Sequence, residues 1–208
     1  MLFRSEAILY KTGCLKAVGR VDNGDAFLDT DKIEKKRGIT IFSKQAVFPL
    51  GDKTFFLQDT PGHVDFSAEM ERTLSVLDYA ILVISAPDGI QSHTELLLEL
   101  LSKHRIPTFV FINKTDLEHG SFAMPEGWVD LGWPSYEDVA LCSEEALDEY
   151  EKTGSVSDEC IRKLIRERKL IPVYRGSALK LTGIDEFLSG LERFTSLAEY
   201  PSDFGARC

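Results

Sequence analysis

Short apolar runs that alternate with helical periodicity are the feature that most constrains this fold. Residues 79–85, 107–112 and 170–174 are mostly apolar and have the length of strands. Such continuous apolar runs are typical of strands that are buried on both faces of a sheet. Between the first two runs, residues 92–104 place their leucines on one side of a helix. This alternation predicts an α/β fold with a mostly parallel sheet and helices on both faces.

Other local patterns predict the remaining elements. Residues 38–49 and 54–58 are rich in β-branched and aromatic side chains and are separated by a turn, so they predict a hairpin. Apolar residues at helical spacing predict helices over 66–78 and 184–194. Residues 117–134 match neither period and are interpreted as an irregular loop.

The composition is that of a globular protein of 208 residues with 43% hydrophobic content. No apolar run approaches the ~18 residues of a membrane span, and the first residues do not form a signal peptide. The cysteines at positions 14, 142, 160 and 208 have no paired spacing, which favours reduced thiols over metal or disulfide use. We therefore expect a cytoplasmic protein without membrane attachment.

The net charge of −10 argues against broad binding to DNA or other nucleic acid. The charge is uneven, because residues 116–160 contain 13 acidic residues and one basic residue. This acidic segment is interpreted as a solvated face. The rest of the chain is slightly positive, so a partner that carries phosphates could still meet it.

The run Asp59 to His63 follows a predicted strand, where loops of α/β sheets bind ligands. A carboxylate at Asp59 can hold Mg²⁺ through water. Gly62 lets the backbone approach a terminal phosphate, because no Cβ intervenes. His63 then lies where it could orient a water that attacks this phosphate. The same run is also a good turn signal.

The run Asn113 to Asp116 ends another predicted strand. The Asp116 carboxylate can accept two hydrogen bonds from guanine, whereas adenine does not present these donors, and an unmatched buried carboxylate is costly. The Lys114 stem can lie along the base, and Asn113 can tie neighbouring loops together. This motif predicts a guanine site.

Two weaker signals complete the set. Ser177 and Ala178 follow a third strand, and small residues there let backbone N–H groups reach the base carbonyl, although small residues are common in loops. The Thr40 hydroxyl could coordinate Mg²⁺ and make its segment sensitive to the terminal phosphate. A plain β-strand threonine is the alternative interpretation.

Taken in order, these runs resemble the GTPase domain of elongation factor G and its relatives. The sequence is most similar to the tetracycline-resistance ribosomal protection proteins. The resemblance rests on Arg37 to Ile41, Asp59 to Phe66, Gly89 to Gln91, Asn113 to Asp116 and Gly176 to Lys180. It implies GTP or GDP and Mg²⁺ as cofactors, the ribosome as partner of the parent protein, and a role in translation or in tetracycline resistance. It also implies a GTP-binding domain over residues 1–200 and the start of a second, β-rich domain at 201–208.

The resemblance further implies a role for each site residue. Asp59 and Thr40 serve Mg²⁺, and His63 orients the hydrolytic water. The guanine base is held by Asn113, Lys114, Asp116, Ser177 and Ala178.

One departure from the family limits these expectations. No Gly-x-x-x-x-Gly-Lys-Ser/Thr phosphate loop occurs in the sequence. Residues 5–10 look like the helix that follows this loop, so the first strand and the loop are expected to be missing. Because that loop does much of the electrostatic work in phosphoryl transfer, we expect weak or absent GTP affinity and no hydrolysis. A nucleotide-free binding module and an inactive fragment are the alternatives.

Overall fold

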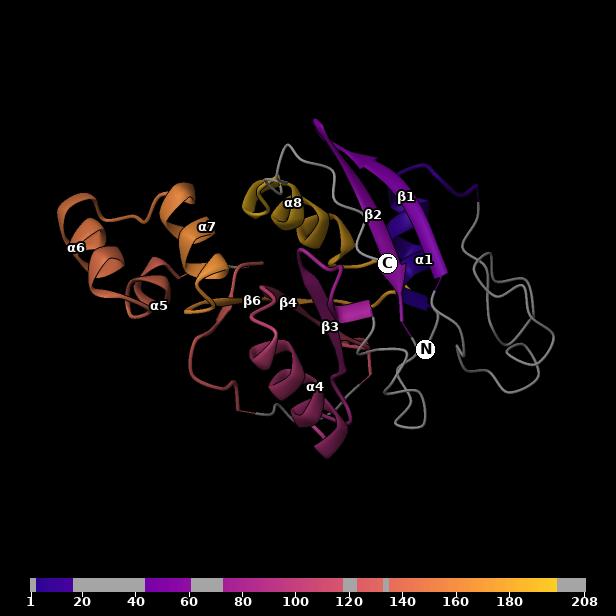
Figure 1. The fold of residues 1–208 in the computed structure, drawn as a ribbon, viewed down its shortest axis with the longest axis horizontal. Helices are drawn as coiled ribbons and strands as arrows, with labels where there is room; N and C mark the ends of the chain where they lie inside the picture. Colours follow the sequence, from indigo (N-terminus) through magenta and orange to yellow (C-terminus); the bar gives the residue numbers. More distant parts are fainter. Residues whose placement is uncertain (1–2, 17–43, 61–72, 118–122, 133–134, 198–208) are drawn as a thin grey trace.

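A four-stranded parallel sheet forms the centre of the computed structural model, which describes residues 3–16, 44–60, 73–117, 123–132 and 135–197. The strands stand in the order β3–β4–β6–β5, and every neighbouring pair is parallel. Figure 1 shows β3, β4 and β6 near the centre of the molecule. Their bounds are β3 (Ala80–Ser85), β4 (Thr108–Asn113), β5 (Trp128–Asp130) and β6 (Ile171–Arg175). The predicted α/β class and three of these strands are therefore confirmed.

Helices cover both faces of this sheet. On one face, Leu97 and Leu98 of α4 (Ser92–Lys103) pack against a cluster that contains Ile84 and Val110. On the other face, α1 (Phe3–Lys11) and α8 (Ile184–Phe194) contribute apolar side chains to the largest core cluster. Successive side chains of a strand point to opposite faces. Since helices cover both faces, all six residues of β4 are buried.

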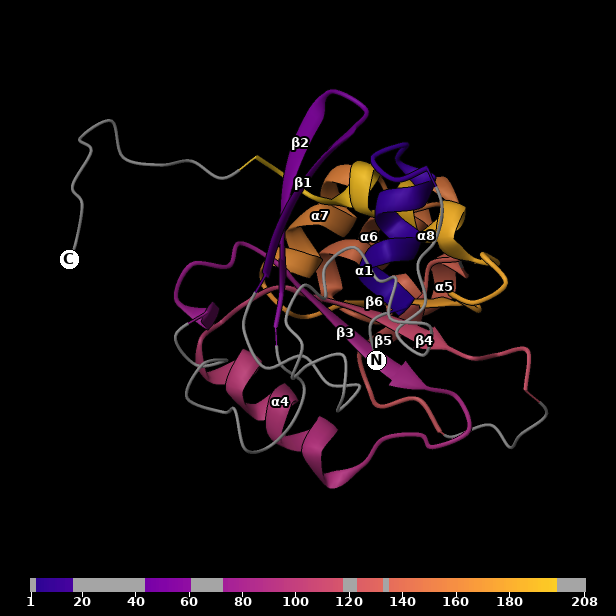
Figure 2. The ribbon, with the colours of Figure 1, turned by 90° about the vertical axis from the view of Figure 1, so that its right-hand side faces the viewer.

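The predicted hairpin is present as a separate two-stranded sheet of β1 (Lys44–Leu50) and β2 (Lys53–Asp59). It extends away from the parallel sheet in Figure 2. Phe48 and Phe55 stack with their ring centroids 5.4 Å apart and join the core cluster. Lys53 fixes the hairpin tip to the end of α8, because its Nζ donates to the Thr195 carbonyl at 2.8 Å.

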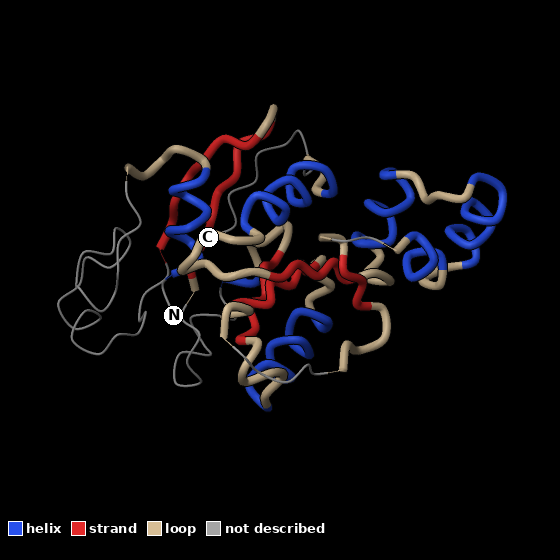
Figure 3. The backbone as a smooth tube through the Cα atoms, turned by 180° about the vertical axis from the view of Figure 1, so that it is seen from behind, coloured by secondary structure: helices blue, strands red, loops and turns tan. Residues whose placement is uncertain are grey.

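Three helices at one end of the molecule include the last part of the acidic segment (Figure 3). They are α5 (Tyr136–Ala140), α6 (Glu144–Thr153) and α7 (Asp158–Arg166). Val139, Ala146 and Val156, which lie within residues 116–160, are buried in the core. The interpretation of the acidic segment as a solvated face is therefore incomplete, because its apolar side chains build part of the core.

Two local predictions are wrong. The irregular loop 117–134 contains β5, a three-residue strand whose Trp128 and Val129 are buried against β6. The helix expected to reach Asp78 ends at Leu74, because the chain turns there and brings Leu74 into one buried cluster with Ala80. Residues 66–72 of that helix and the predicted domain boundary near residue 200 lie outside the described residues. A membrane-spanning helix is not found in the part of the chain that the structure describes.

Candidate functional site

The loops that follow β4 and β6 meet at one edge of the sheet, since these strands are neighbours with Ile112 opposite Arg175. Asn113 is buried, and its Oδ1 accepts the Ala178 backbone N–H at 2.9 Å. The Thr115 N–H donates to the Gly176 carbonyl at 3.2 Å. The two predicted guanine loops are therefore tied to one another by hydrogen bonds.

The second loop is held in a tight conformation by its own backbone. The Ser177 N–H donates to the Thr182 carbonyl at 3.0 Å, and the Thr182 N–H donates back to Ser177 at 3.1 Å. A Cβ on Gly176 would lie 2.1 Å from the Thr182 carbonyl oxygen, and Gly183 has φ +74°. The loop therefore needs glycine at both ends, and its two buried small residues, Ser177 and Ala178, have fixed positions.

Asp116 presents a carboxylate at this site. Its side chain is 15% exposed, and its Oδ2 lies 3.4 Å from the Lys180 Nζ. The hydrogen bond from Ser177 is the main cause that lowers the pKa of Asp116, and Lys180 lowers it further. The carboxylate is therefore ionised at neutral pH, and an ionised carboxylate only accepts hydrogen bonds.

Lys114 is exposed and has φ +65°, a backbone conformation that residues other than glycine rarely adopt. Ala178 has its N–H engaged by Asn113, so it could serve a base carbonyl only by sharing this donor. Asp59 ends β2 and therefore stands in the hairpin rather than in the parallel sheet. Thr40, Gly62 and His63 lie outside the described residues.

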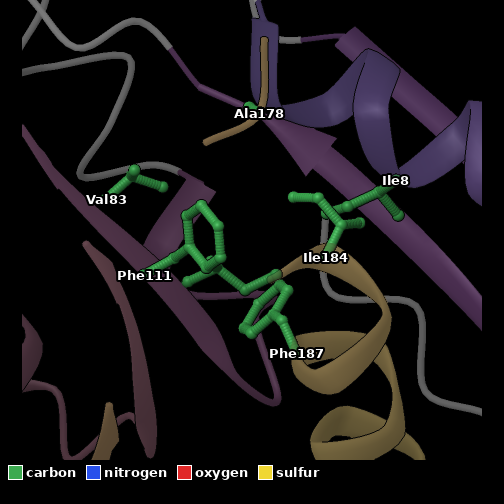
Figure 4. A pocket seen from close by; sticks show the side chains of 7 residues that line it. Ile8, Val83, Phe111, Ala178, Ile184 and Phe187 are labelled. Carbon is green, nitrogen blue, oxygen red and sulfur yellow. The ribbon is translucent and has the colours of Figure 1, made fainter. Parts of the chain in front are cut away.

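A small apolar pocket lies behind the second loop (Figure 4). Ala178 forms one wall, and the others come from α1, β3, β4 and α8. Ile8, Val83, Phe111 and Phe187 are among the lining residues. The pocket has no polar side chain to receive a base, so it supports the loop from the core side.

The described residues contain no group of three or more His, Cys, Asp or Glu that could hold a metal ion. The Mg²⁺ assignment of Asp59 and Thr40 thus stays a prediction, as do the roles of the other site residues. The structure adds Lys180 to the candidate site, which the predicted set does not include. No local pattern signals its contact with Asp116, because the two residues are far apart in the sequence.

Comparison with known proteins places this arrangement in a family. The sequence model of the Elongation factor Tu GTP binding domain matches residues 4–196. The tetracycline resistance protein TetP of Clostridium perfringens is 49% identical over 54% of this chain and 17% of its own length. The oxytetracycline resistance protein of Streptomyces rimosus and the tetracycline resistance protein TetM of Streptomyces lividans are each 34% identical over 90% of this chain. Each of these two matches covers 34% of the relative's own length, so the chain spans about a third of them.

Solved structures support the fold. A crystal structure of a Thermus thermophilus protein superposes with a TM-score of 0.78 at 21% identity, covering 94% of this chain and 38% of that one. Translation elongation factor SelB from Methanococcus maripaludis, in complex with the GTP analogue GppNHp, gives a TM-score of 0.52 at 21% identity. That match covers 78% of this chain and 30% of SelB. Since the family match extends over nearly the whole sequence, this chain belongs to the elongation factor Tu GTP-binding domain family.

Proposed function

We propose that the loops after β4 and β6 form the base-binding part of a site for GTP and GDP. The observation that carries this proposal is Asp116, an enclosed carboxylate that Ser177 stabilises in its ionised form. The ring N–H and the exocyclic amino group of guanine are two neighbouring donors that match such a carboxylate. Adenine offers no such pair, and it would leave the carboxylate unmatched.

We further propose that the parent protein hydrolyses GTP on the ribosome, in translation or in tetracycline resistance by ribosomal protection. Support comes from the family and from relatives that are named as tetracycline resistance proteins. In this proposal Asp59 and Thr40 serve Mg²⁺, Gly62 approaches the terminal phosphate and His63 orients the attacking water. The protein then works in the cytoplasm, where ribosomes are.

The 208-residue chain itself is proposed to bind guanine nucleotides weakly and not to hydrolyse GTP. Its sequence contains no phosphate loop of the Gly-Lys-Ser/Thr type. Without that loop the phosphates lose their backbone N–H donors and their lysine.

A nucleotide-free binding module is the second candidate. It is favoured by the same lack of a phosphate loop, since a fold with buried strands can persist without its ligand. The base site separates the two candidates, because a pure binding module has no reason to discriminate guanine from adenine.

A titration of the ¹⁵N-labelled chain with GDP and with ADP tests the proposal. We expect GDP to shift the amide signals of residues 113–116 and 176–180 with no saturation at micromolar concentrations, and ADP to leave them unchanged. Asp116→Asn should transfer the preference to xanthosine diphosphate, because the amide can donate to the carbonyl that replaces the guanine amino group. Equal shifts with GDP and ADP, or no change of preference in the variant, would refute the guanine site.

A further inference from the structure

The carboxylate of the candidate base site already has a cationic partner. The Lys180 Nζ lies 3.4 Å from Asp116 Oδ2, and the side chain of Lys180 is 60% exposed while that of Asp116 is 15% exposed. The positive charge of Lys180 also lowers the pKa of Asp116. The ammonium therefore reaches the carboxylate from the solvent side, which is also the side from which a ligand must arrive.

The backbone of Lys180 is held in place by the loop, whereas its exposed side chain can move away from Asp116. Its N–H donates to Ser177 Oγ at 3.3 Å, and the next residue, Leu181, is held at φ +57°. The same Ser177 side chain is the main cause that lowers the pKa of Asp116. The loop thus holds the lysine beside the carboxylate, and the exposed ammonium can move into water at small cost, since exposed ion pairs contribute little.

We propose that Lys180 acts as a counter-ion in the base subsite and competes with guanine for Asp116, an inference that rests on the proposed guanine site. Guanine needs acceptor positions on the carboxylate for both of its donors. Ser177 and Lys180 each take part of the limited acceptor capacity of that group. The base must therefore displace the ammonium before both of its hydrogen bonds can form, and Lys180 lowers the affinity of the site for guanine.

Competition by an ion pair predicts an unusual response to salt. Salt screens the attraction between the lysine and the carboxylate, whereas guanosine is neutral and loses nothing by screening. The binding of guanosine should therefore become tighter as the salt concentration rises. A lysine with a purely structural role in the loop would not produce this dependence.

The test uses the full chain and guanosine, which lacks phosphates and so reports on the base subsite alone. Lys180→Met keeps most of the side-chain length and removes the charge. At 50 mM NaCl we expect this variant to bind guanosine more tightly by up to about fivefold, the range of exposed ion pairs. The difference should close at 500 mM NaCl, because the wild-type affinity rises. Equal or weaker binding by the variant at low salt would overturn the inference.

Lys163→Met is the matched control, because Lys163 is also an exposed lysine paired with a carboxylate, Glu145 on α6. This variant should bind guanosine like the wild type at both salt concentrations. An equal gain of affinity in this control would show a general charge effect and overturn the inference.

A measurement without ligand separates this inference from the proposed function. In the nucleoside-free chain, carboxyl ¹³C signals should show a higher pKa of Asp116 in Lys180→Met than in the wild type, since Lys180 is one of the groups that lower it. An unchanged pKa together with guanosine binding would overturn the competition and leave the guanine site standing. A raised pKa with no guanosine binding in any variant would refute the guanine site, and the competition with it.

Discussion

Asn113 shows at the residue scale how a motif residue can act through the fold. Its amide oxygen accepts the N–H of Ala178, which is 65 positions away in the sequence, and both residues are buried. The side chain therefore fixes the loop that carries Ser177, the residue that contributes most to the lowered pKa of Asp116. Its first effect is on the geometry of the site, before any contact with a ligand.

Asn113→Ala should destabilise the chain by about 1–3 kcal/mol, because it leaves a buried N–H without an acceptor. The free energy of unfolding, measured by urea denaturation, checks this expectation. Thr115→Ala in the same loop is the control, since this side chain is exposed. A loss below about 0.5 kcal/mol for Asn113→Ala, the level of ordinary surface substitutions, would contradict the role assigned to this hydrogen bond.

Tyr174, unlike Asn113, is a buried polar residue whose side chain has no hydrogen-bond partner among the described residues. Its hydroxyl is buried, and burial raises its pKa. It fits only because Gly190 has no side chain, since a Cβ there would lie 1.9 Å from the hydroxyl oxygen.

Tyr174→Phe should leave the free energy of unfolding unchanged or raise it by about 1 kcal/mol, because it removes an unsatisfied buried polar group. Thermal and urea denaturation of the two proteins provide the comparison. A clear loss of stability would show that the hydroxyl has a partner in solution.

At the scale of elements, α6 and α7 each begin with a serine whose side chain caps the helix. Ser157 begins α7 and accepts the Cys160 N–H at 3.3 Å, while Ser143 begins α6 and accepts the Ala146 N–H at 3.1 Å. The two helices differ in burial, because α7 buries Ile161, Leu164 and Ile165 whereas α6 buries one residue, Ala146. Equal caps should therefore have unequal consequences for the whole domain.

Ser157→Ala should lower the global free energy of unfolding by about 0.5–2 kcal/mol, the usual effect of losing an N-cap. Ser143→Ala should mainly increase amide exchange in the first turn of α6, with a smaller effect on global unfolding. Ser102→Ala, on the exposed side of α4, serves as the control without a cap. Equal global losses for both cap variants would contradict the proposed difference between the helices.

At the scale of the whole molecule, the described chain forms two sheets, and the parallel one ends at β3. Ala80 and Ala86 donate their N–H groups toward the β4 side, to Pro107 and Asn113. Because bonding direction alternates along a parallel strand, Leu82 and Ile84 also face β4. The N–H groups of Ile81 and Val83 then face the other edge, which has no strand partner among the described residues.

Native-state hydrogen exchange should therefore alternate along β3. The amides of Leu82 and Ile84 should be strongly protected, and those of Ile81 and Val83 should exchange faster by a factor of ten or more, about 1.4 kcal/mol in opening free energy. The amides of β4, which has partners on both sides, provide the internal reference. Uniform protection along β3 would show that another segment pairs with this edge in solution.

Local sequence patterns determined a large part of this structure. Apolar runs predicted β3, β4 and β6 to within one residue at each end, and helical spacing predicted the bounds of α8. The motifs predicted to bind guanine also lie at the ends of β4 and β6, as expected. These predictions succeed because the periods of strands and helices, and the placement of loops after strands, depend on residues that are close in the sequence.

Only the tertiary structure decided the rest. The three residues of β5 are too few to show a period, and they become a strand because β6 offers an edge beside them. The strand order, the separation of the hairpin and the Lys180–Asp116 pair likewise depend on contacts between distant positions. Such contacts form where independent elements meet in space. The sequence by itself therefore determined the motifs of the two loops proposed to bind guanine, and only the fold decided which side chains surround them.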